Sequence, residues 1–263
     1  MSGLLKSCLC TQAGLESPAL RQWIEPLRET FHVHRKLWEY CYIVQALAER
    51  GLLAPGRRGL GFAVGQEPLA ALFASLGCEI VATDLAEERA REQGWVASNQ
   101  HASNLAVLNQ RGICDPAVFA ERVTFRYVDM NDIPPDLDGF DFLWSSCAFE
   151  HLGTIEHGKR FVERAMDCLV PGGVAVHTTE YNVSSNTATV DHGGYVLFRR
   201  RDIEDLAERL RRRGHEIVLD FDPGRGEYDR QFDAPPYQET VHLKLQVSGF
   251  IATSIGLIIR KAP

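Results

Sequence analysis

Residues 59–84, GLGFAVGQEPLAALFASLGCEIVATD, decide the fold. They comprise a short apolar strand, a glycine-containing loop at residues 61–68, a helical stretch with one apolar face, and a second strand that ends at Asp84. This order is typical of a βαβ nucleotide-binding unit, in which the amides of the loop face a ligand and the carboxylate binds ribose hydroxyls. Because the glycine pattern is incomplete, the assignment depends on the loop and Asp84 together.

The remainder of the chain alternates strand-like and helix-like segments, which predicts an α/β fold with a Rossmann-like, mostly parallel sheet and helices on both faces. Residues 19–50 carry helical periodicity, so residues 1–50 are expected to form a helical cap and residues 51–263 the main domain. The long polar segment 222–240 is expected to lie over the substrate. We expect helices at residues 68–76, 87–93 and 155–169. We expect strands at residues 59–62, 79–83, 123–128, 140–144, 174–179, 217–221, 242–247 and 254–260.

The composition is that of a globular protein and argues against several classes of partner. Hydrophobic residues make up 45% and charged residues 24% of the chain, and the formal charge of -7 disfavours a nucleic-acid partner. The seven cysteines show no metal-ligand spacing, which indicates buried thiols in a reducing compartment. Without a signal-peptide pattern or an apolar run of about 18 residues, we expect a cytoplasmic protein with no membrane partner.

Glu67 helps to distinguish between two cofactor classes. A carboxylate at the start of a helix would repel a dinucleotide pyrophosphate, but it would attract the cationic groups of S-adenosylmethionine, which carries no phosphate. The alternative is that Glu67 only stabilises the first turn of the helix, which would suit either cofactor. The lack of a Tyr-x-x-x-Lys pair after the fourth strand is a second argument against a NAD-dependent short-chain reductase.

Three segments resemble, in order, the cofactor motifs of class I S-adenosylmethionine-dependent methyltransferases. They are LGFAVGQEPLAALFASLGCEIVATDLAEE (60–88), FRYVDMNDIPPDLDGFDFLWSSCAFEHLG (125–153) and MDCLVPGGVAVHTTEYNV (166–183). Within this superfamily the chain resembles a bacterial group whose loop reads G-F-G-V-G-x-E-P-L and which is associated with glycan and natural-product pathways. The chain departs from that group at Ala63, where the group has glycine. It departs from the broader superfamily at Gly61, where an acid is common, and at Glu67, where glycine is common.

The resemblance implies a seven-stranded sheet whose last strand, residues 254–260, is antiparallel. It also implies S-adenosylmethionine as the cofactor and S-adenosylhomocysteine as the product, bound at the carboxyl ends of the strands. Glu67 would then replace the missing acid at the methionine ammonium. Met130 has an equally good interpretation as a core residue. The remaining contacts that the resemblance implies are Ala63, Val64 and Gly65 beside the methionine part, Asp84 at the ribose, Asp129 and Met130 at the adenine, and Ser145 beside the methyl group.

The helical cap supplies further candidates for cofactor binding. Trp38 and Glu39 would contact the cofactor or the substrate, and Arg35 and Lys36 would face the methionine carboxylate. The alternatives are core packing for Trp38 and solvent exposure for Lys36.

Polar residues just past the strand ends are the candidates for the chemistry. Methyl transfer to a hydroxyl needs a general base, and His151 is the first candidate because its unperturbed pKa suits neutral pH. Glu180, which ends a buried strand, is the second candidate. Each has a structural alternative, His151 as part of a helix start and Glu180 as a partner of the neighbouring turn. The candidates for substrate binding are Glu150, Asn182, Tyr228, Tyr237 and His242.

A metal is not assigned from the sequence. Magnesium is the metal that the acidic and histidine side chains near these strand ends could bind, but their spacing resembles no ligand motif. The side chains concerned are Glu150, His151, Glu180, Asp191, His192 and His242.

The sequence therefore favours a methyltransferase that acts on a hydroxyl of a sugar, a glycan or a small secondary metabolite. Two alternatives stay open: N-methylation of a small amine, which needs a base less, and a catalytically silent subunit that binds S-adenosylmethionine and works through a partner. The expected partner is a small-molecule or carbohydrate acceptor. The oligomeric state is left open, a homodimer being one option.

Overall fold

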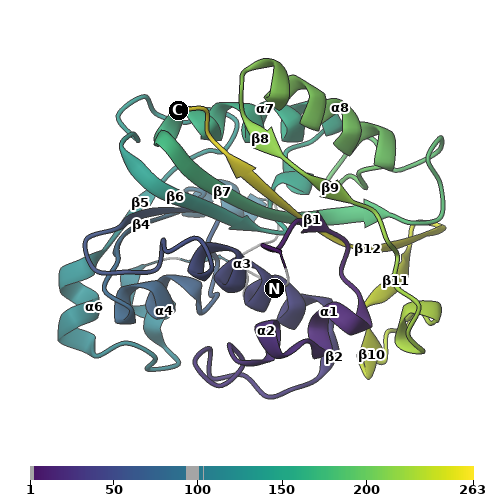
Figure 1. Ribbon diagram of the computed structural model, residues 1–263, viewed down its shortest axis with the longest axis horizontal. Helices are drawn as coiled ribbons and strands as arrows, with labels where there is room; N and C mark the ends of the chain where they lie inside the picture. Colours follow the sequence, from purple (N-terminus) through teal and green to yellow (C-terminus); the bar gives the residue numbers. More distant parts are fainter. Residues whose placement is uncertain (1–2, 93–100, 103) are drawn as a thin grey trace.

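The computed structural model describes residues 3–92, 101–102 and 104–263, and a central eight-stranded sheet organises the fold (Figure 1). Seven of its strands are hydrogen bonded in the order β11-β12-β7-β6-β3-β4-β5, and β8 lies beside β12. The five strands from β3 to β7 pair in parallel, whereas β12 is antiparallel to β7, β8 and β11. The bounds are β3 Arg58–Phe62, β4 Glu79–Asp84, β5 Val123–Tyr127, β6 Phe140–Ser146, β7 Leu169–Asn182, β8 Glu216–Ile217, β11 Lys244–Val247 and β12 Phe250–Arg260.

The expected α/β fold and the antiparallel last strand are confirmed, and the sheet has one strand more than the seven that the resemblance implies. The extra strand comes from the tight hairpin that joins β11 to β12. Its two turn residues, Ser248 and Gly249, have φ values of 48° and 81°. Two successive positive φ values are what a two-residue hairpin requires, so the chain folds straight back onto β12.

Two segments that were expected to form single strands each divide between two partners. Residues 217–221 give β8, which pairs with β12, and β9 (Leu219–Asp220), which pairs with β1 (Ser7–Cys8). Residues 242–247 give β11 and part of β10 (Val241–His242), which pairs with β2 (Val33–His34). Short N-terminal strands therefore take up backbone groups that the main sheet leaves unpaired.

Helices cover both faces of the sheet, and each face has its own apolar core. In Figure 1, α7 and α8 lie on one side of the sheet and α3, α4 and α6 lie on the other. Phe161 of α7 and Leu206 of α8 belong to one core cluster, whereas Trp38 of α3 and Phe73 of α4 belong to the second. The α-helices are α1 Gln12–Glu16, α2 Pro18–Arg21, α3 Arg35–Ala48, α4 Leu69–Ser75, α5 Glu87–Glu92, α6 Pro116–Arg122, α7 Ile155–Ala165 and α8 Arg200–Arg212. The 3-10 helices are η1 Leu105–Asn109, η2 Phe149–His151, η3 Met166–Cys168 and η4 Tyr228–Arg230.

The helical periodicity over residues 19–50 does not correspond to one helix. The helix α2 ends at Arg21, turns follow, and α3 begins only at Arg35. Pro26 lies in this interval, and proline disfavours helical geometry at the residue before it and supplies no N–H. The side chain of His34 then starts α3, because its Nδ1 accepts a hydrogen bond from the Lys36 amide at 3.0 Å.

Most of the other expected boundaries are close to those observed, but β7 begins at Leu169 instead of residue 174 and β12 begins at Phe250 instead of residue 254. The expected helix 155–169 ends early: α7 stops at Ala165, and Leu169 already belongs to β7, where it pairs with Phe140. Residue 93, the expected end of α5, lies outside the described residues. Within the ranges that the structure describes, no helix is both long and apolar enough to cross a bilayer.

Candidate functional site

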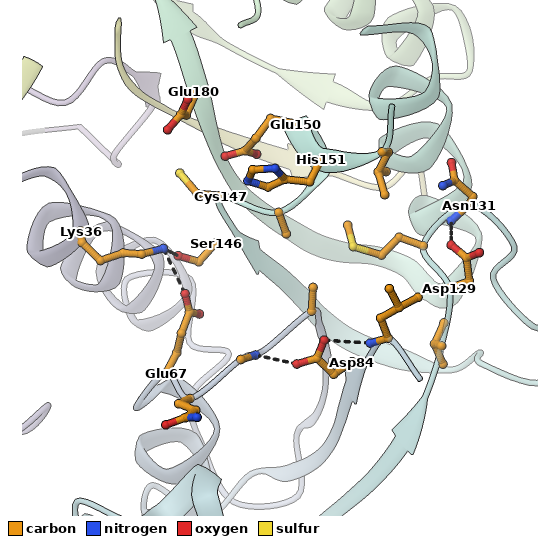
Figure 2. A pocket seen from close by; sticks show the side chains of 18 of the residues that line it. Lys36, Glu67, Asp84, Asp129, Asn131, Ser146, Cys147, Glu150, His151 and Glu180 are labelled. Carbon is orange, nitrogen blue, oxygen red and sulfur yellow. Dashed lines mark hydrogen bonds and ion pairs between the residues drawn. The ribbon is translucent and has the colours of Figure 1, made fainter. Parts of the chain in front are cut away.

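A cavity of about 620 Å³ lies at the carboxyl ends of β3, β4, β5 and β6, where an open α/β sheet places its ligand site (Figure 2). This volume is in the range of small-molecule sites, roughly 300–1,000 Å³. Its wall consists of Arg35, Lys36, Tyr40, Ala63, Gly65, Gln66, Glu67, Asp84, Leu85, Arg89, Val128, Asp129, Met130, Asn131, Ser146, Cys147, Ala148, Glu150, His151, Leu152 and Glu180.

The loop after β3 bends sharply around the carboxylate of Asp84. Ala63 and Gly65 both have positive φ, 47° and 51°, so the backbone turns back towards the end of β4. The Gly65 amide donates to Asp84 Oδ2 at 3.1 Å, and the amides of Ala102 and Leu85 donate to the same carboxylate at 2.9 and 2.8 Å. Burial raises the pKa of Asp84, and these amides act in the opposite direction. The result is a fixed carboxylate in the floor of the cavity.

The absence of an acid at Gly61 has a steric explanation. A Cβ atom at Gly61 would lie 2.4 Å from the indole ring of Trp144 and 2.5 Å from Val64 Cγ1. Trp144 is the register partner of Gly61 in β6 and is fully buried. The large indole therefore occupies the space that a side chain on β3 would need, and any acid for the cavity must come from another position.

Glu67 extends into the cavity from the residues just before α4. Its Oε1 lies 3.2 Å from Lys36 Nζ, whereas its Oε2 is buried and has no hydrogen-bond partner among the described residues (Figure 2). Burial raises the pKa of Glu67 to about 7, although Lys36 acts to lower it. Since α4 begins at Leu69 and Glu67 makes an ion pair with Lys36, the first-turn interpretation does not describe it.

Glu39, a completely buried acid, anchors the two cations at the start of α3. It contacts Arg35 at 3.1 Å and Lys36 at 3.0 Å, and it accepts a hydrogen bond from the Ser254 hydroxyl at 2.5 Å. Burial opposes its ionisation, but the two cations and the hydroxyl outweigh burial and lower the pKa of Glu39 to about 2. Arg35 also binds Glu180 at 2.6 Å. Glu39 therefore fixes both cations beside the cavity without lining it.

A second group of polar side chains lies on the opposite side of the cavity from Asp84. Figure 2 shows Cys147, Glu150, His151 and Glu180 there. The Nδ1 atom of His151 lies 2.9 Å from the carbonyl oxygen of Gly194. Because a carbonyl only accepts, Nδ1 carries the proton and Nε2 is the basic nitrogen of the neutral ring.

Glu150 and Cys147 are unusual members of this group. Glu150 is fully buried, Thr179 Oγ1 donates to its Oε2 at 2.9 Å, and its Oε1 has no partner within the described part of the chain. Burial raises the pKa of Glu150. Cys147 has a φ of 46°, which is strained for a residue with a Cβ, and such strain is concentrated at functional sites.

Asp129 and Asn131 form a third part of the cavity wall, apart from the two groups described above. Asp129 accepts a hydrogen bond from the Asn131 amide at 2.9 Å, and Arg89 of α5 contacts its other oxygen at 2.5 Å. Met130 between them is 6% exposed, so it serves both the core and the wall of the cavity.

Besides Glu39, three of the expected cofactor contacts lie outside the cavity wall. Val64 packs in the core, and Trp38 stacks on Tyr42 with 4.6 Å between ring centroids, so the core alternative for Trp38 describes it. Ser145 is fully buried, and its hydroxyl lies 2.8 Å from His177 Nδ1. Since successive residues of a strand face opposite sides, Ser146 and not Ser145 reaches the cavity.

Four of the expected substrate residues also lie outside the wall. Asn182 accepts the amides of Ser184 and Ser185 in a turn, and the Tyr228 amide donates to Gln12. The Tyr237 hydroxyl donates to a backbone carbonyl, and His242 contacts Asp233 at 2.8 Å. The expected cover 222–240 contributes no residue to the wall.

Several wall residues were not expected from the sequence. Gln66, Arg89, Asn131 and Cys147 line the cavity, and each lies within a few residues of a strand end or of the loop after β3. Position relative to the strand ends would have identified Asn131 and Cys147, but Arg89 comes from a helix face that the sequence leaves undetermined. Within the described ranges, no group of three His, Cys, Asp or Glu side chains is arranged to hold a metal ion.

Comparison with protein-family models finds a match in the central segment of the chain. Residues 60–177 match the family model Methyltransf_11, described as a methyltransferase domain. No curated protein sequence matches the chain.

Solved structures with this fold include enzymes of different activity. The cyclase SpnF has a TM-score of 0.53 and 17% identity, over 100% of this chain and 99% of its own. Magnesium protoporphyrin IX methyltransferase from Synechocystis PCC 6803, with bound S-adenosylhomocysteine, has a TM-score of 0.51 and 11% identity, over 94% of this chain and 96% of its own. The glycopeptide N-methyltransferase MtfA has a TM-score of 0.50 and 15% identity, over 84% of this chain and 95% of its own. At these identities the likeness establishes the fold.

The side chains of the cavity fit the cofactor that a methyltransferase domain uses. Asp84 suits ribose hydroxyls, and the unpaired oxygen of Glu67 suits an ammonium group. The neighbouring Lys36 suits the carboxylate of the cofactor. S-adenosylmethionine carries no phosphate, so it needs no cluster of phosphate-binding groups. The domain match and this donor set agree with S-adenosylmethionine as the cofactor. Residues 60–177, less than half of the chain, therefore resemble a methyltransferase domain.

Proposed function

We propose that the protein methylates a hydroxyl group of a small polar acceptor, a sugar, a glycan or a secondary metabolite, with His151 as the general base. The observation that carries this proposal is the contact between His151 Nδ1 and the Gly194 carbonyl at 2.9 Å. This contact fixes the tautomer of His151 in which Nε2 can accept a proton, and His151 is part of the cavity wall.

The arrangement of the wall supports one orientation of the cofactor. Asp129 would receive the adenine amino group, Asp84 the ribose, and Glu67 with Lys36 the amino-acid part. When bound, S-adenosylmethionine supplies an electrophilic methyl group. Within the described part of the wall, these contacts leave for an acceptor the side with Cys147, Glu150, His151 and Glu180 (Figure 2).

His151 is preferred to Glu180 as the base because Glu180 is already engaged. Arg35 contacts the Glu180 carboxylate at 2.6 Å, so this carboxylate already has a cationic partner. Glu180 would instead accept a hydrogen bond from an acceptor hydroxyl and so orient it. This role fits a carboxylate whose side chain keeps 14% exposure at the cavity.

Replacement of His151 tests the base. We expect His151→Ala to lower kcat about 100-fold or more, the usual contribution of a general base, and to leave the affinity for S-adenosylhomocysteine within about twofold. His157→Ala is the matched control, because His157 lies on α7 outside the cavity wall. Retention of kcat in the His151→Ala, Glu180→Ala double variant would contradict the base assignment and favour N-methylation.

N-methylation is the second candidate function, and the unpaired Oε1 atom of Glu150 favours it. This oxygen would bind an amine on the acceptor side of the cavity. The product distinguishes the two functions, because mass spectrometry and NMR locate the new methyl group on oxygen or on nitrogen. A silent cofactor-binding subunit is the outcome if cofactor binds and no acceptor is methylated.

A further inference from the structure

The carboxylates of the ionic network beside the cavity outnumber its cations. Arg35 is shared between Glu39 and Glu180, at 3.1 and 2.6 Å, and Lys36 is shared between Glu39 and Glu67, at 3.0 and 3.2 Å. Two cations thus serve three carboxylates in this network. Above the pKa of Glu67, which is about 7, the network carries one excess negative charge before any further acid of the wall is counted.

Glu150 is a further acid of the wall, and among the described residues no Lys or Arg forms an ion pair with it. Its side chain is 0% exposed, and Thr179 Oγ1 holds Oε2 at 2.9 Å. The second oxygen, Oε1, is buried and accepts no hydrogen bond from any described group. A buried carboxylate oxygen without a donor is costly, so such an oxygen in a cavity wall marks the position of a missing ligand group.

The neighbours of Glu150 determine which ligand group is favourable there. Figure 2 shows its carboxylate on the same side of the cavity as Cys147, His151 and Glu180. Burial disfavours the charge of Glu150 and raises its pKa; His151 acts in the opposite direction, and Glu180 adds to the effect of burial. A cation placed at Oε1 would restore the ionised form and offset the excess of acid. A carboxylate or phosphate at the same place would be repelled by both glutamates.

We propose that the acceptor carries a protonated amine that binds Glu150 Oε1, next to the hydroxyl that is presented to His151. The substrate class is therefore an amino sugar or a related amino alcohol, and acidic sugars are excluded from the site. This inference rests on the proposed methyl transfer for the role of His151, but the binding of the amine is independent of the reaction.

The role of Glu150 in binding also explains why the hydroxyl is the group that reacts. An ammonium held by a carboxylate has no lone pair and is not a nucleophile, so N-methylation would first require the loss of its proton. The neighbouring hydroxyl, whose proton passes to His151 Nε2, forms the new C–O bond as the methyl–sulfur bond of the donor breaks. The sulfur retains the electron pair of that bond and leaves as the neutral thioether, S-adenosylhomocysteine.

The proposal is tested by binding to the full chain saturated with S-adenosylhomocysteine, where no methyl transfer takes place. The probes are two matched pairs, D-glucosamine with D-glucose and trans-2-aminocyclohexanol with trans-cyclohexane-1,2-diol, and the dissociation constants are measured by ligand-observed NMR at pH 7. We expect the amino member of at least one pair to bind about tenfold or more tightly than its hydroxyl partner. We expect Glu150→Gln to abolish that preference.

The matched control is Glu156→Gln, because Glu156 is an exposed acid on α7 that pairs with Arg209. This variant should keep the preference of the parent. Equal binding of both members, absence of amine binding, or a preference that survives in Glu150→Gln overturns the proposal. Tighter binding of the hydroxyl members also overturns it, since it would show Glu150 to be a protonated hydrogen-bond donor.

Failure of this proposal is distinguishable from failure of the proposed function. Incubation of the same probes with S-adenosylmethionine shows where the methyl group goes. Amine-dependent binding with an N-methylated product supports the role of Glu150 and contradicts O-methylation. An O-methylated product without any amine preference supports the proposed function and contradicts the role of Glu150.

Discussion

Lys36 Nζ lies 3.2 Å from Glu67 Oε1, and this ion pair joins the start of α3 to the loop that follows β3. The same ammonium lies 3.0 Å from Glu39 Oε2, so the cation is shared with a fully buried acid. The other oxygen of Glu67 is buried without a hydrogen-bond partner in the described structure. The pair therefore offers both a cation and an unused acceptor to the amino-acid part of a ligand.

Replacement of Glu67 tests the contact to the methionine ammonium. We predict that Glu67→Gln weakens the binding of S-adenosylhomocysteine about tenfold at pH 7.5, because a charge-assisted hydrogen bond is lost. The loss should shrink at pH 5.5, since the pKa of Glu67 is about 7 and the parent carboxyl is then protonated as well. Titration calorimetry measures both values. Glu79→Gln, an exposed position on β4, is the control, and equal affinities of parent and Glu67→Gln at pH 7.5 would assign Glu67 a structural role only.

The raised pKa of Glu67 also predicts how the stability of the ligand-free protein depends on pH. The folded state holds the Glu67 proton up to about pH 7, whereas the unfolded state releases it near the ordinary value of 4.5. Stability from this group is therefore complete below pH 4.5 and is lost as the pH rises through about 7. Relative to Glu67→Gln, the parent should lose on the order of 2 kcal/mol between pH 5 and pH 8. Urea unfolding at several pH values measures the difference, and parallel curves for both proteins would refute the prediction.

Ala63 stands in a backbone conformation that favours glycine. Its φ is 47°, and this geometry costs a residue with a Cβ about 1 kcal/mol or more. We predict that Ala63→Gly raises the free energy of unfolding by about 0.5 kcal/mol, after the greater entropy of glycine in the unfolded chain is taken into account. Ala71→Gly, inside α4, should lower it by about 1 kcal/mol. A destabilised Ala63→Gly variant would contradict the account of this loop.

The βαβ unit and the alternation of strands and helices could be predicted because they depend on local patterns. Residues such as Asp84 and Asp129 follow from their position at strand ends, where an open sheet brings them to one edge. The pairing of Lys36 with Glu67 could not be predicted, because the two residues are 31 positions apart and meet only through the packing of α3 on the sheet. The orientation of Ser145 away from the cavity, with Ser146 facing it, depends on the pleat of β6 at a strand end that the pattern leaves uncertain by one residue.

The contacts of the segment 222–240 could not be predicted from its polar composition. Its charged and aromatic side chains suggested a cover for the substrate, but they are used within the segment and its neighbours. Asp233 accepts the amides of Gln238 and Glu239 and contacts His242, which stacks on His34 at 4.6 Å. These contacts hold the segment against the start of α3, and its proposed role toward the substrate stays a prediction.

The buried ionic network predicts different costs for two partners of one ion pair. Arg35→Met would leave Glu39 completely buried with Lys36 as its remaining cation, and we expect a loss of about 3 kcal/mol in the free energy of unfolding. Glu180→Gln removes a carboxylate that keeps 14% side-chain exposure, and we expect a loss of about 1 kcal/mol or less. Urea denaturation compares the two. Equal losses would show that Glu39 does not depend on Arg35.

The central claim is that the cavity binds S-adenosylmethionine rather than a dinucleotide. Calorimetric titration of the full chain with S-adenosylmethionine, S-adenosylhomocysteine and NAD, in parallel and in one buffer, tests it most directly. The account predicts saturable binding of the first two ligands at one site per chain and no binding of NAD. Tight binding of NAD, with no response to S-adenosylmethionine or S-adenosylhomocysteine, would contradict it.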